Sequence, residues 1–296
     1  MDGILIIDKP PDWSSAQVVA SLKRLSHAKK AGHTGILDPY ATGIMICCLN
    51  RATRLSRFFL EGNKSYEAIL CLGIETDTQD FTGKKNVVMD PQNITDAQIE
   101  AAFKQCIGQQ EQSPPLFSAL KHEGTPLYKL ARKGIFIQKP PRTIHIYSLH
   151  ILEIHNPYVR FQVSCSTGTY IRTLCNHLGK LLGCGAHLTS LKRTESCGFT
   201  MDDAVSMETI SAYASRKAIP ELLINMADAL RHLPEYIANE DLLQKIANGK
   251  PVNESDGLPM TKKYLKVVDT QNHLHAVLMC AKDNQYHYCC VFNESL

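Results

Sequence analysis

Hydrophobic residues along most of the chain repeat with two different periods, which predict a mixture of strands and helices. The run from 3 to 7 is apolar and short, as in a buried strand. Ser14 and Gln17 form a capping-box pattern ahead of apolar residues at helical spacing. Between 64 and 72 apolar residues alternate, as in a strand with one buried face. Similar patterns predict helices after Thr95, from Pro126 to Gly134 and over 171–181, and strands at 46–49, 143–154 and 159–166.

The pattern changes near residue 231. A helix that ends near Ala247, with Gly249 just past its end, precedes three short strands at 263–268, 273–281 and 286–292. Up to about residue 231 the predicted strands alternate with helices, and after the helix that ends near Ala247 strands follow one another. The predicted fold class is therefore α/β or α+β. We therefore expect two domains, 1–231 and 232–296.

Composition narrows the class of protein. The chain has 296 residues, with 44% hydrophobic and 21% charged, as in folded proteins with enough length for two cores. Its longest apolar runs, such as 44–49, are far shorter than a membrane span requires. Eleven cysteines without a Cys-x-x-Cys pair indicate reduced thiols and a cytoplasmic protein. Cys184 and His187 form a Cys-x-x-His pattern, but core or surface roles are far more common for such a couple than zinc binding.

The stretch from Ala31 to Gly43 is the strongest candidate for chemistry. It holds three glycines, His33 and the single carboxylate Asp38, between clusters of lysine and arginine. Asp38 followed by Pro39 is also typical of a type I turn, and on spacing alone a turn is the more common role.

This stretch resembles the signature of the TruB family of tRNA pseudouridine synthases, as Gly32-His33-Thr34-Gly35-x-Leu37-Asp38-Pro39-x-Ala41-Thr42-Gly43. Further blocks resemble that family in the same order: Asp8-Lys9-Pro10, Lys64-x-Tyr66-x-Ala68, Thr76-Asp77-Thr78-x-Asp80, Pro114-Pro115-x-x-Ser118-Ala119-Leu120-Lys121, Leu127-Tyr128-x-x-Ala131-Arg132-x-Gly134, Gly168-Thr169-Tyr170-Ile171-Arg172 and Leu191-x-Arg193-Thr194. The blocks span about residues 3–199. The tail is similar, more faintly, to the small RNA-binding PUA module of the family.

The resemblance implies a catalytic domain with a mainly antiparallel mixed sheet flanked by helices, followed by a PUA-like module. It implies isomerisation of uridine 55 in the T loop of tRNA to pseudouridine. That reaction breaks the bond from ribose C1′ to uracil N1 and rejoins the base through C5. No oxidation state changes and no external group enters, so the resemblance implies no cofactor and no metal. The expected partner is the T arm of tRNA, without a guide RNA or a membrane, and we expect a monomer.

The resemblance also assigns catalytic roles. Asp38 matches the family's nucleophile, which attacks either C1′ or C6 of the uracil, and Arg172 matches the arginine that pairs with it and keeps it ionised. Tyr66 matches the tyrosine that stacks on the base and takes the C5 proton. By pattern alone, Arg172 is a solvated helix charge and Tyr66 an ordinary core residue.

The same resemblance gives substrate contacts. The target uridine must leave its stack, and His33 matches the residue that contacts the flipped nucleotides. A lone histidine in a loop is otherwise most often a surface residue. The remaining candidates for substrate binding are Tyr170, Leu191, Lys9, Lys64 and Arg193, the last three as phosphate contacts. The segment from about 112 to 140 is similar to an RNA-gripping insertion, and its simpler interpretation is an exposed hairpin.

Two departures and three alternatives accompany this interpretation. Tyr40 and Asn50-Arg51 differ from the residues common in the family, which affects the expected shape of the pocket only. The catalytic subunit of a guide-RNA-directed particle shares the signatures, but such subunits have terminal extensions and this chain ends at Leu296. A catalytically inactive RNA-binding protein would need no buried carboxylate. A zinc-dependent deaminase would need a His-x-Glu and Pro-Cys-x-x-Cys signature, which the sequence lacks.

Charge is unevenly distributed behind a net value of only +3. The windows 17–64, 119–142 and 160–193 together hold 19 of the 32 basic residues and 3 of the 29 acidic ones. If they converge in space, they form the basic surface that phosphate contacts require.

Overall fold

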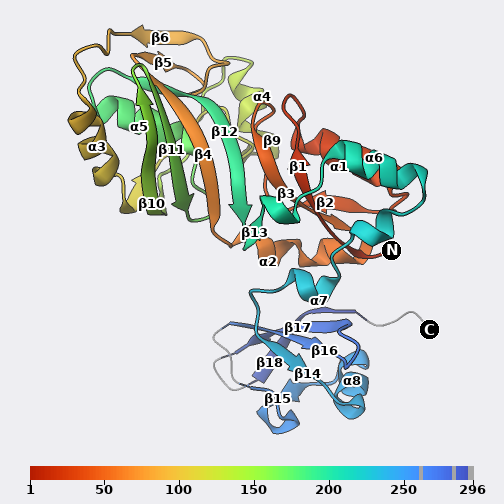
Figure 1. Ribbon diagram of the computed structural model, residues 1–296. Helices are drawn as coiled ribbons and strands as arrows, with labels where there is room; N and C mark the ends of the chain where they lie inside the picture. Colours follow the sequence, from red (N-terminus) through yellow and green to blue (C-terminus); the bar gives the residue numbers. More distant parts are fainter. Residues whose placement is uncertain (260–262, 282–284, 293–296) are drawn as a thin grey trace. The chain divides into compact units, whose positions relative to one another are not determined.

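The computed structural model describes residues 1–259, 263–281 and 285–292 (Figure 1). It divides into two compact units that interleave along the chain. Unit 1 consists of Met1–Pro39, Ile44–Leu60 and Cys197–Leu296, and unit 2 of Tyr40–Gly43 and Glu61–Ser196. This division does not coincide with the expected boundary near residue 231, which stays a prediction. Among the described residues, no helix is long and apolar enough to cross a bilayer.

Unit 2 is built on one sheet. Its strand order is β12 (Ala186–Ser196), β4 (Lys64–Leu72), β11 (Tyr158–Cys165), β10 (Arg142–His155) and β7 (Gly108–Gln112). All four neighbouring pairs are antiparallel. Thr42 and Gly43, which begin β3 (Thr42–Leu49), lie parallel to Lys192 and Arg193 of β12. The predicted mixed, mainly antiparallel sheet is therefore confirmed.

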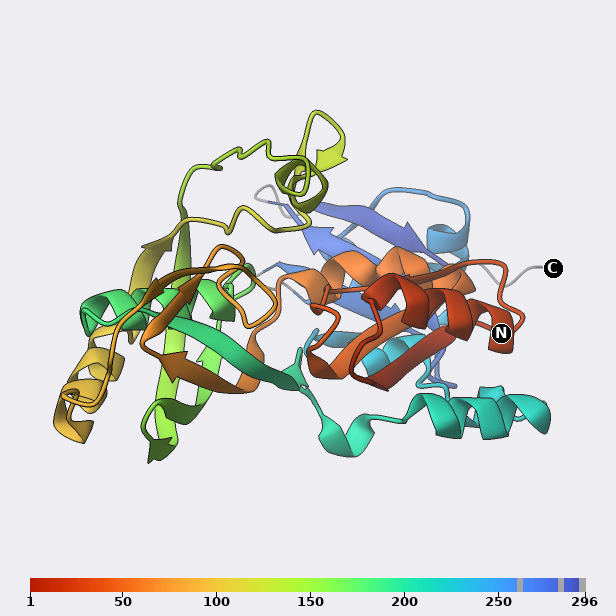
Figure 2. The same ribbon diagram turned by 90° about the horizontal axis from the view of Figure 1, so that it is seen from above.

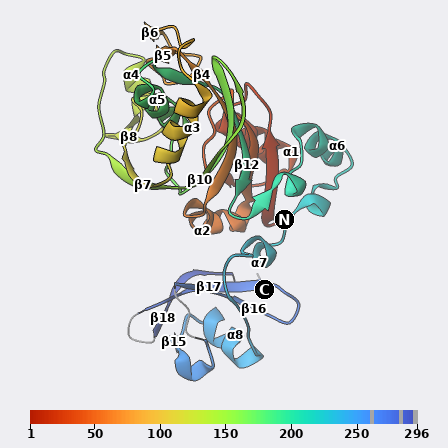
Figure 3. The same cartoon turned by 60° about the vertical axis from the view of Figure 1, so that its left-hand side comes forward.

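Two helices cover one face of this sheet (Figures 1 and 3). α3 (Asp96–Gln105) begins with the predicted capping box of Thr95 and Gln98, and α5 (Ile171–Leu181) packs against β12 and β4. The Phe103 ring of α3 meets Phe161 of β11 edge-on, with 5.3 Å between ring centroids. The burial of alternate residues on β4 confirms the strand that the 64–72 pattern predicts.

A long segment of unit 2 extends from the sheet between β7 and β10 (Figure 2). It carries a short hairpin of β8 (Lys121–His122) and β9 (Thr125–Pro126), followed by α4 (Leu127–Ala131). The prediction that Pro126 is the first helical residue is wrong, because Pro126 pairs with Lys121 in the hairpin and α4 begins one residue later. A second hairpin, β5 (Ile74–Thr76) with β6 (Lys85–Val88), was not predicted.

Unit 1 places short strands beside helices. β3 has β1 (Gly3–Lys9) as a neighbour and pairs antiparallel with β2 (Ala31–His33). α1 (Ser15–Leu25) starts at the predicted capping box. Further helices before the tail are α2 (Ser56–Leu60), α6 (Met207–Ser215) and α7 (Met226–Ala229). Unit 1 also contains the short strand β13 (Phe199–Thr200) and short 3-10 turns at Asn50–Leu55, Met201–Asp203, Ile219–Leu222 and Glu254–Asp256.

The tail of unit 1 has its own sheet. The order is β14 (Glu235–Ile237), β16 (Tyr264–Val268), β17 (Leu274–Cys280), β18 (Gln285–Val291) and β15 (Val252–Asn253). α8 (Glu240–Ala247), capped by Asn239, lies beside β17. The three strands predicted for the tail are confirmed. Val268 and Leu274 share one hydrophobic cluster with Ile4 and Ile6 of β1, which explains why the tail groups with unit 1.

Candidate active site

Asp38 lies in a loop whose main chain is held on both sides. Before it, the Ser15 hydroxyl accepts a hydrogen bond from the Leu37 amide at 3.0 Å and contacts the Leu37 carbonyl oxygen at 3.2 Å. After it, the ammonium of Lys9 donates to the Pro39 carbonyl oxygen at 2.8 Å. Asp38 itself is half-buried. The start of α1 and the end of β1 thus fix the backbone that carries the predicted nucleophile.

Lys9 is fully buried, at 0% exposure. Its ammonium also donates to the carbonyl oxygens of Pro10 at 2.9 Å and Trp13 at 2.5 Å. A buried charge requires such hydrogen bonds to offset its lost hydration. The phosphate contact predicted for Lys9 stays a prediction. The three hydrogen bonds described for its ammonium join the segment from Pro10 to Trp13 to Pro39.

His33 ends β2 at the start of the same loop. It is half-buried, and its Nδ1 accepts a hydrogen bond from the Gly35 amide at 3.4 Å. The neighbouring Thr34 amide donates to the Ile46 carbonyl oxygen at 3.1 Å, which ties the loop to β3. The contact of His33 with flipped nucleotides stays a prediction.

Four predicted site residues share one face of the β4–β12 ladder. Tyr66 lies opposite Arg193, and Ala68 lies opposite Leu191. Directly opposed residues of antiparallel strands point to the same face, and so do residues two apart on one strand. The four are largely buried, with exposures of 8% for Lys64, 7% for Tyr66, 8% for Leu191 and 2% for Arg193. The register therefore brings together residues that the sequence separates by more than a hundred positions.

Gly43 shows why the signature ends in glycine. Its φ is +94°, and a Cβ at this position would overlap the Arg193 carbonyl oxygen. Only glycine combines this backbone conformation with so close an approach. Gly43, the last residue of the Asp38 stretch, can therefore pack directly against β12.

Lys64 lies at the start of β4. Its ammonium donates to the Gly62 carbonyl oxygen at 2.8 Å.

Hydrogen bonds and an ion pair hold the guanidinium of Arg172 in place. Its Nη1 donates to the Thr78 carbonyl oxygen at 2.8 Å and its Nη2 to the Phe117 carbonyl oxygen at 2.9 Å. Nη1 also lies 3.6 Å from Oδ2 of Asp80, in an ion pair whose two side chains are 5% and 6% exposed. The alternative by pattern alone, a solvated helix charge, is therefore wrong, because the Arg172 side chain is buried. Its predicted pairing with Asp38 joins residues of different units and stays a prediction.

Asp80 is the charged partner that the sequence did not assign. Its Oδ1 accepts from the Thr78 hydroxyl at 2.8 Å, the Thr82 amide at 2.9 Å and the Thr82 hydroxyl at 2.5 Å. These donors hold the carboxylate in place beneath Arg172. The signal was the Thr76–Asp80 block itself, which resembles the family but carried no assigned role.

Tyr170 is the N-cap residue of α5. The amide group of Gln112 spans its backbone: Oε1 accepts from the Tyr170 amide at 2.7 Å, and Nε2 donates to the Tyr170 carbonyl oxygen at 3.1 Å. The Arg142 guanidinium lies over the Tyr170 ring, 4.9 Å from its centroid, and donates to the Gly168 carbonyl oxygen. Gln112 and Arg142 have no assigned role in the sequence patterns.

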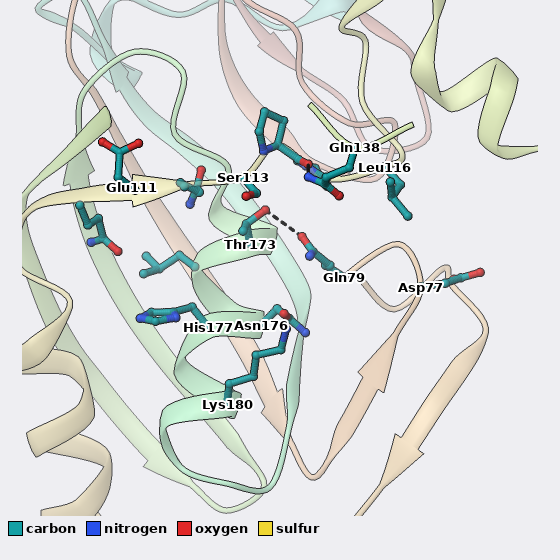
Figure 4. Close-up of a pocket in the computed structure, with 15 residues that line it drawn as sticks. Asp77, Gln79, Glu111, Ser113, Leu116, Gln138, Thr173, Asn176, His177 and Lys180 are labelled. Carbon is teal, nitrogen blue, oxygen red and sulfur yellow. Dashed lines mark hydrogen bonds between the residues drawn. The ribbon is translucent and has the colours of Figure 1, made fainter. Parts of the chain in front are cut away.

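A polar pocket of about 420 Å³ lies beside α5 (Figure 4). Thr173, Asn176, His177 and Lys180 of α5 line it, together with the end of β7 and the following prolines. The Thr173 hydroxyl donates to Oε1 of Gln79, another lining residue, at 2.8 Å. Its lining includes none of the residues predicted to be catalytic, so the pocket is a feature separate from them.

Cysteines and histidines of the described residues do not gather into a metal site: no group of three or more His, Cys, Asp or Glu could hold an ion there. Nδ1 of His187 donates to the Ile74 carbonyl oxygen at 2.9 Å, and Cys184 is buried. All eleven cysteines are free. Burial raises the pKa of Cys48 to about 12 and that of Cys165 to about 11, so both thiols stay protonated at neutral pH.

Two family models match the chain in succession. The first, TruB family pseudouridylate synthase (N terminal domain), matches residues 23–171, and the second, tRNA pseudouridylate synthase B C-terminal domain, matches 172–233. Curated relatives agree. A tRNA pseudouridine synthase B of Syntrophotalea carbinolica is 43% identical over 251 residues, covering 85% of this chain and 82% of the relative. Another from Syntrophus aciditrophicus is 43% identical over 249 residues, covering 84% and 80%.

The fold of this chain is also similar to that of chains in solved structures. A Cbf5-Nop10-Gar1 complex contains a chain that is 26% identical, with a TM-score of 0.74, covering 94% of this chain and 78% of that one. An H/ACA RNP bound to a substrate RNA containing 2'-deoxyuridine gives a TM-score of 0.70 at 25% identity, with the same coverage. Because the family models and the curated relatives cover most of its length, the chain belongs to the TruB family of pseudouridine synthases.

Proposed function

We propose that this chain isomerises uridine 55 in the T loop of tRNA to pseudouridine, without a guide RNA and with Asp38 as the nucleophile. The observation that carries the proposal is the 43% identity to proteins named tRNA pseudouridine synthase B over 85% of the chain. The loop of Asp38 supports it, because hydrogen bonds hold the backbone on both sides of a single carboxylate. A nucleophile requires this kind of fixed position.

The proposed chemistry balances within the substrate. The bond from C1′ to N1 breaks, and a bond from C1′ to C5 forms after the base has turned. One proton leaves C5 and one arrives at N1. Asp38 attacks C1′ of the ribose or C6 of the uracil, and both routes need its carboxylate ionised. Arg172, whose guanidinium is held by two carbonyl oxygens, supplies the cation that favours this ionised form.

Substrate roles follow the face of the β4–β12 ladder. Tyr66, at 7% exposure, stacks on the extruded uracil and takes the C5 proton. Leu191 and Tyr170 line the pocket, and His33 contacts the flipped nucleotides. The insertion between β7 and β10 grips the T arm, with its basic residues against phosphate. The protein acts as a monomer in the cytoplasm.

The guide-directed alternative rests on the solved relatives. Chains of the Cbf5-Nop10-Gar1 complex and of the H/ACA particle share this fold at 26% and 25% identity. The relatives named tRNA pseudouridine synthase B are 43% identical, which favours the guide-independent activity. A catalytically inactive RNA-binding protein is the second alternative, and the buried ion pair of Arg172 with Asp80 is an unneeded cost for binding alone.

The experiment that tests the proposal is Asp38→Asn, assayed for pseudouridine in tRNA and, separately, for tRNA binding. Asp12→Asn is the control, because Asp12 is an exposed carboxylate of the same unit. We expect a loss of turnover of at least about 1,000-fold for Asp38→Asn, with binding kept, and unchanged turnover for the control. Turnover in a strong chelator should also be undiminished. Full activity of Asp38→Asn would overturn the mechanism.

A further inference from the structure

The insertion between β7 and β10 is tied at both ends to the start of α5. Gln112 is the last residue of β7, and Arg142 is the first residue of β10. The two lie opposite each other in the sheet. Both side chains bond to the segment from Gly168 to Tyr170. Gln112 bonds to Tyr170, 58 residues away in the sequence, and Arg142 bonds to Gly168, 26 residues away. Two side chains thus link the ends of the insertion to the segment from Gly168 to Tyr170.

Gln112 holds the main chain of Tyr170, the N-cap residue of α5. The side chain of Tyr170 makes no capping hydrogen bond, although it stands at the N-cap position. Gln112, 6% exposed, bonds through its side-chain amide to the backbone N–H and carbonyl of Tyr170, and that carbonyl also accepts from the Leu174 amide at 3.1 Å. Two parallel hydrogen bonds from one planar group fix orientation as well as distance. Gln112 therefore sets the backbone from which the Tyr170 ring projects.

Arg142 restrains the ring itself. Its guanidinium lies 4.9 Å from the centroid of Tyr170 and donates to the Gly168 carbonyl oxygen. Gly168 has a φ of +87°, and a Cβ there would come within 3.2 Å of the guanidinium. The glycine thus leaves the space in which Arg142 lies. A cation over an aromatic face holds both groups by electrostatic attraction.

We propose that Gln112 and Arg142 are positioning residues that hold Tyr170 for the reaction and connect the state of the insertion to the substrate pocket. This inference rests on the proposed function, because Tyr170 is assigned to the pocket there. A third contact supports the connection: the Phe117 carbonyl oxygen, within the insertion, accepts from Arg172 at 2.9 Å. When the insertion closes on RNA, Gln112, Arg142 and the Phe117 carbonyl then move or tighten the start of α5, because each of them already contacts it.

The test is a double-mutant cycle on purified full-length protein with an unmodified tRNA transcript. Gln112→Met and Arg142→Met are each combined with Tyr170→Ala, and single-turnover rates are measured at saturating enzyme. We expect each Met variant to lower the rate by about tenfold when Tyr170 is present and by less than about twofold in the Tyr170→Ala background. The affinity of the Gln112→Met variant for tRNA should change by less than about threefold, because this substitution removes no positive charge.

Conservative and matched variants separate positioning from folding. Gln112→Glu keeps the acceptor for the Tyr170 amide at a helix N-terminus, so its rate should lie between those of the wild type and Gln112→Met. Gln110→Leu removes a hydrogen bond from the same strand to the Cys106 carbonyl oxygen, and Arg216→Met removes a cation–ring contact with Tyr213 in unit 1. Both controls should keep the wild-type rate.

Two results would overturn the inference. One is rates that fall equally with and without the Tyr170 ring, and the other is a rate for Gln112→Met equal to that of Gln110→Leu. Failure of the proposed function is distinguishable, since it shows as an active Asp38→Asn, or as product that forms at another position or only when another RNA is added. Thermal unfolding of each variant accompanies the rates, and a variant that does not fold is replaced by Gln112→Glu or Arg142→Lys in the same cycle.

Discussion

Unit 1 and unit 2 hold their principal charged residues in different ways. Around Asp38, the described hydrogen bonds run to the main chain of its neighbours, from Ser15 to Leu37 and from Lys9 to Pro39. Around Arg172, they run to the guanidinium itself, which donates to two carbonyl oxygens and lies 3.6 Å from Asp80. The hydrogen bonds described in unit 1 fix the backbone around Asp38, and those described in unit 2 fix the guanidinium of Arg172.

The difference matches the two roles that we propose. A nucleophile must form and break a bond, so its position is best set from the backbone while its carboxylate takes part in the reaction. A cation that stabilises charge works best when its donors are oriented in advance and do not reorganise. We expect changes around Asp38 to act on turnover through loop position, and changes at Arg172 to act through charge and stability together.

Arg172→Met should have the largest effect on stability. It removes the cation from a pair with 5% and 6% exposed side chains and leaves Asp80 buried without it. We expect the free energy of unfolding to fall by about 3 kcal/mol, measured by urea titration. Arg160→Met is the control, because its pair with Glu67 at 2.7 Å is 46% and 30% exposed and should contribute less than about 1 kcal/mol. Equal losses for the two variants would remove the distinction between a buried and a surface pair.

Lys9→Met should have the next largest effect. The methionine fills the space of a fully buried side chain but leaves three carbonyl oxygens without their donor. We expect a fall of about 2 kcal/mol in the free energy of unfolding and a lower kcat, because the Pro39 carbonyl beside Asp38 is released. Lower affinity for tRNA at an unchanged kcat would instead support the phosphate contact predicted from the sequence.

Ser15→Ala should have the smallest effect on stability. It removes the contacts of one hydroxyl with Leu37, and we expect a loss of about 1 kcal/mol. Ser26→Ala is matched to it, since Ser26 is equally buried in the same region and donates to the Leu22 carbonyl oxygen at 2.7 Å. Both variants should lose similar stability in thermal unfolding, but only Ser15→Ala should lower kcat. A normal kcat for Ser15→Ala would show that this side of the loop does not position Asp38.

Local patterns in the sequence predicted elements well where one face is buried. The alternation over 64–72 and the capping boxes at Ser14 and Thr95 are confirmed. β7 was not predicted, because four of its five residues are polar and its pairing with β10 is what makes it a strand. β12 was missed for a similar reason, since bulges interrupt its alternation against β4.

The sequence predicted the candidate site only as far as the resemblance reached. The sequence did not predict which charged residues are buried. Lys9 and Arg193 are predicted phosphate contacts, yet only 0% and 2% of their surfaces are exposed. Contacts between distant residues were also out of reach. Asp80 with Arg172, and Gln112 with Tyr170, depend on the register of strands and on the path of the insertion, which no local pattern encodes.

The most direct measurement of the central claim uses the purified wild-type chain, an unmodified tRNA transcript and no other RNA. Pseudouridine is mapped at every uridine, in this transcript and in a matched one with cytidine at position 55. The account predicts pseudouridine at position 55 of the first transcript and none in the second. Product that forms only when another RNA is added, or that forms at a different position, would contradict it.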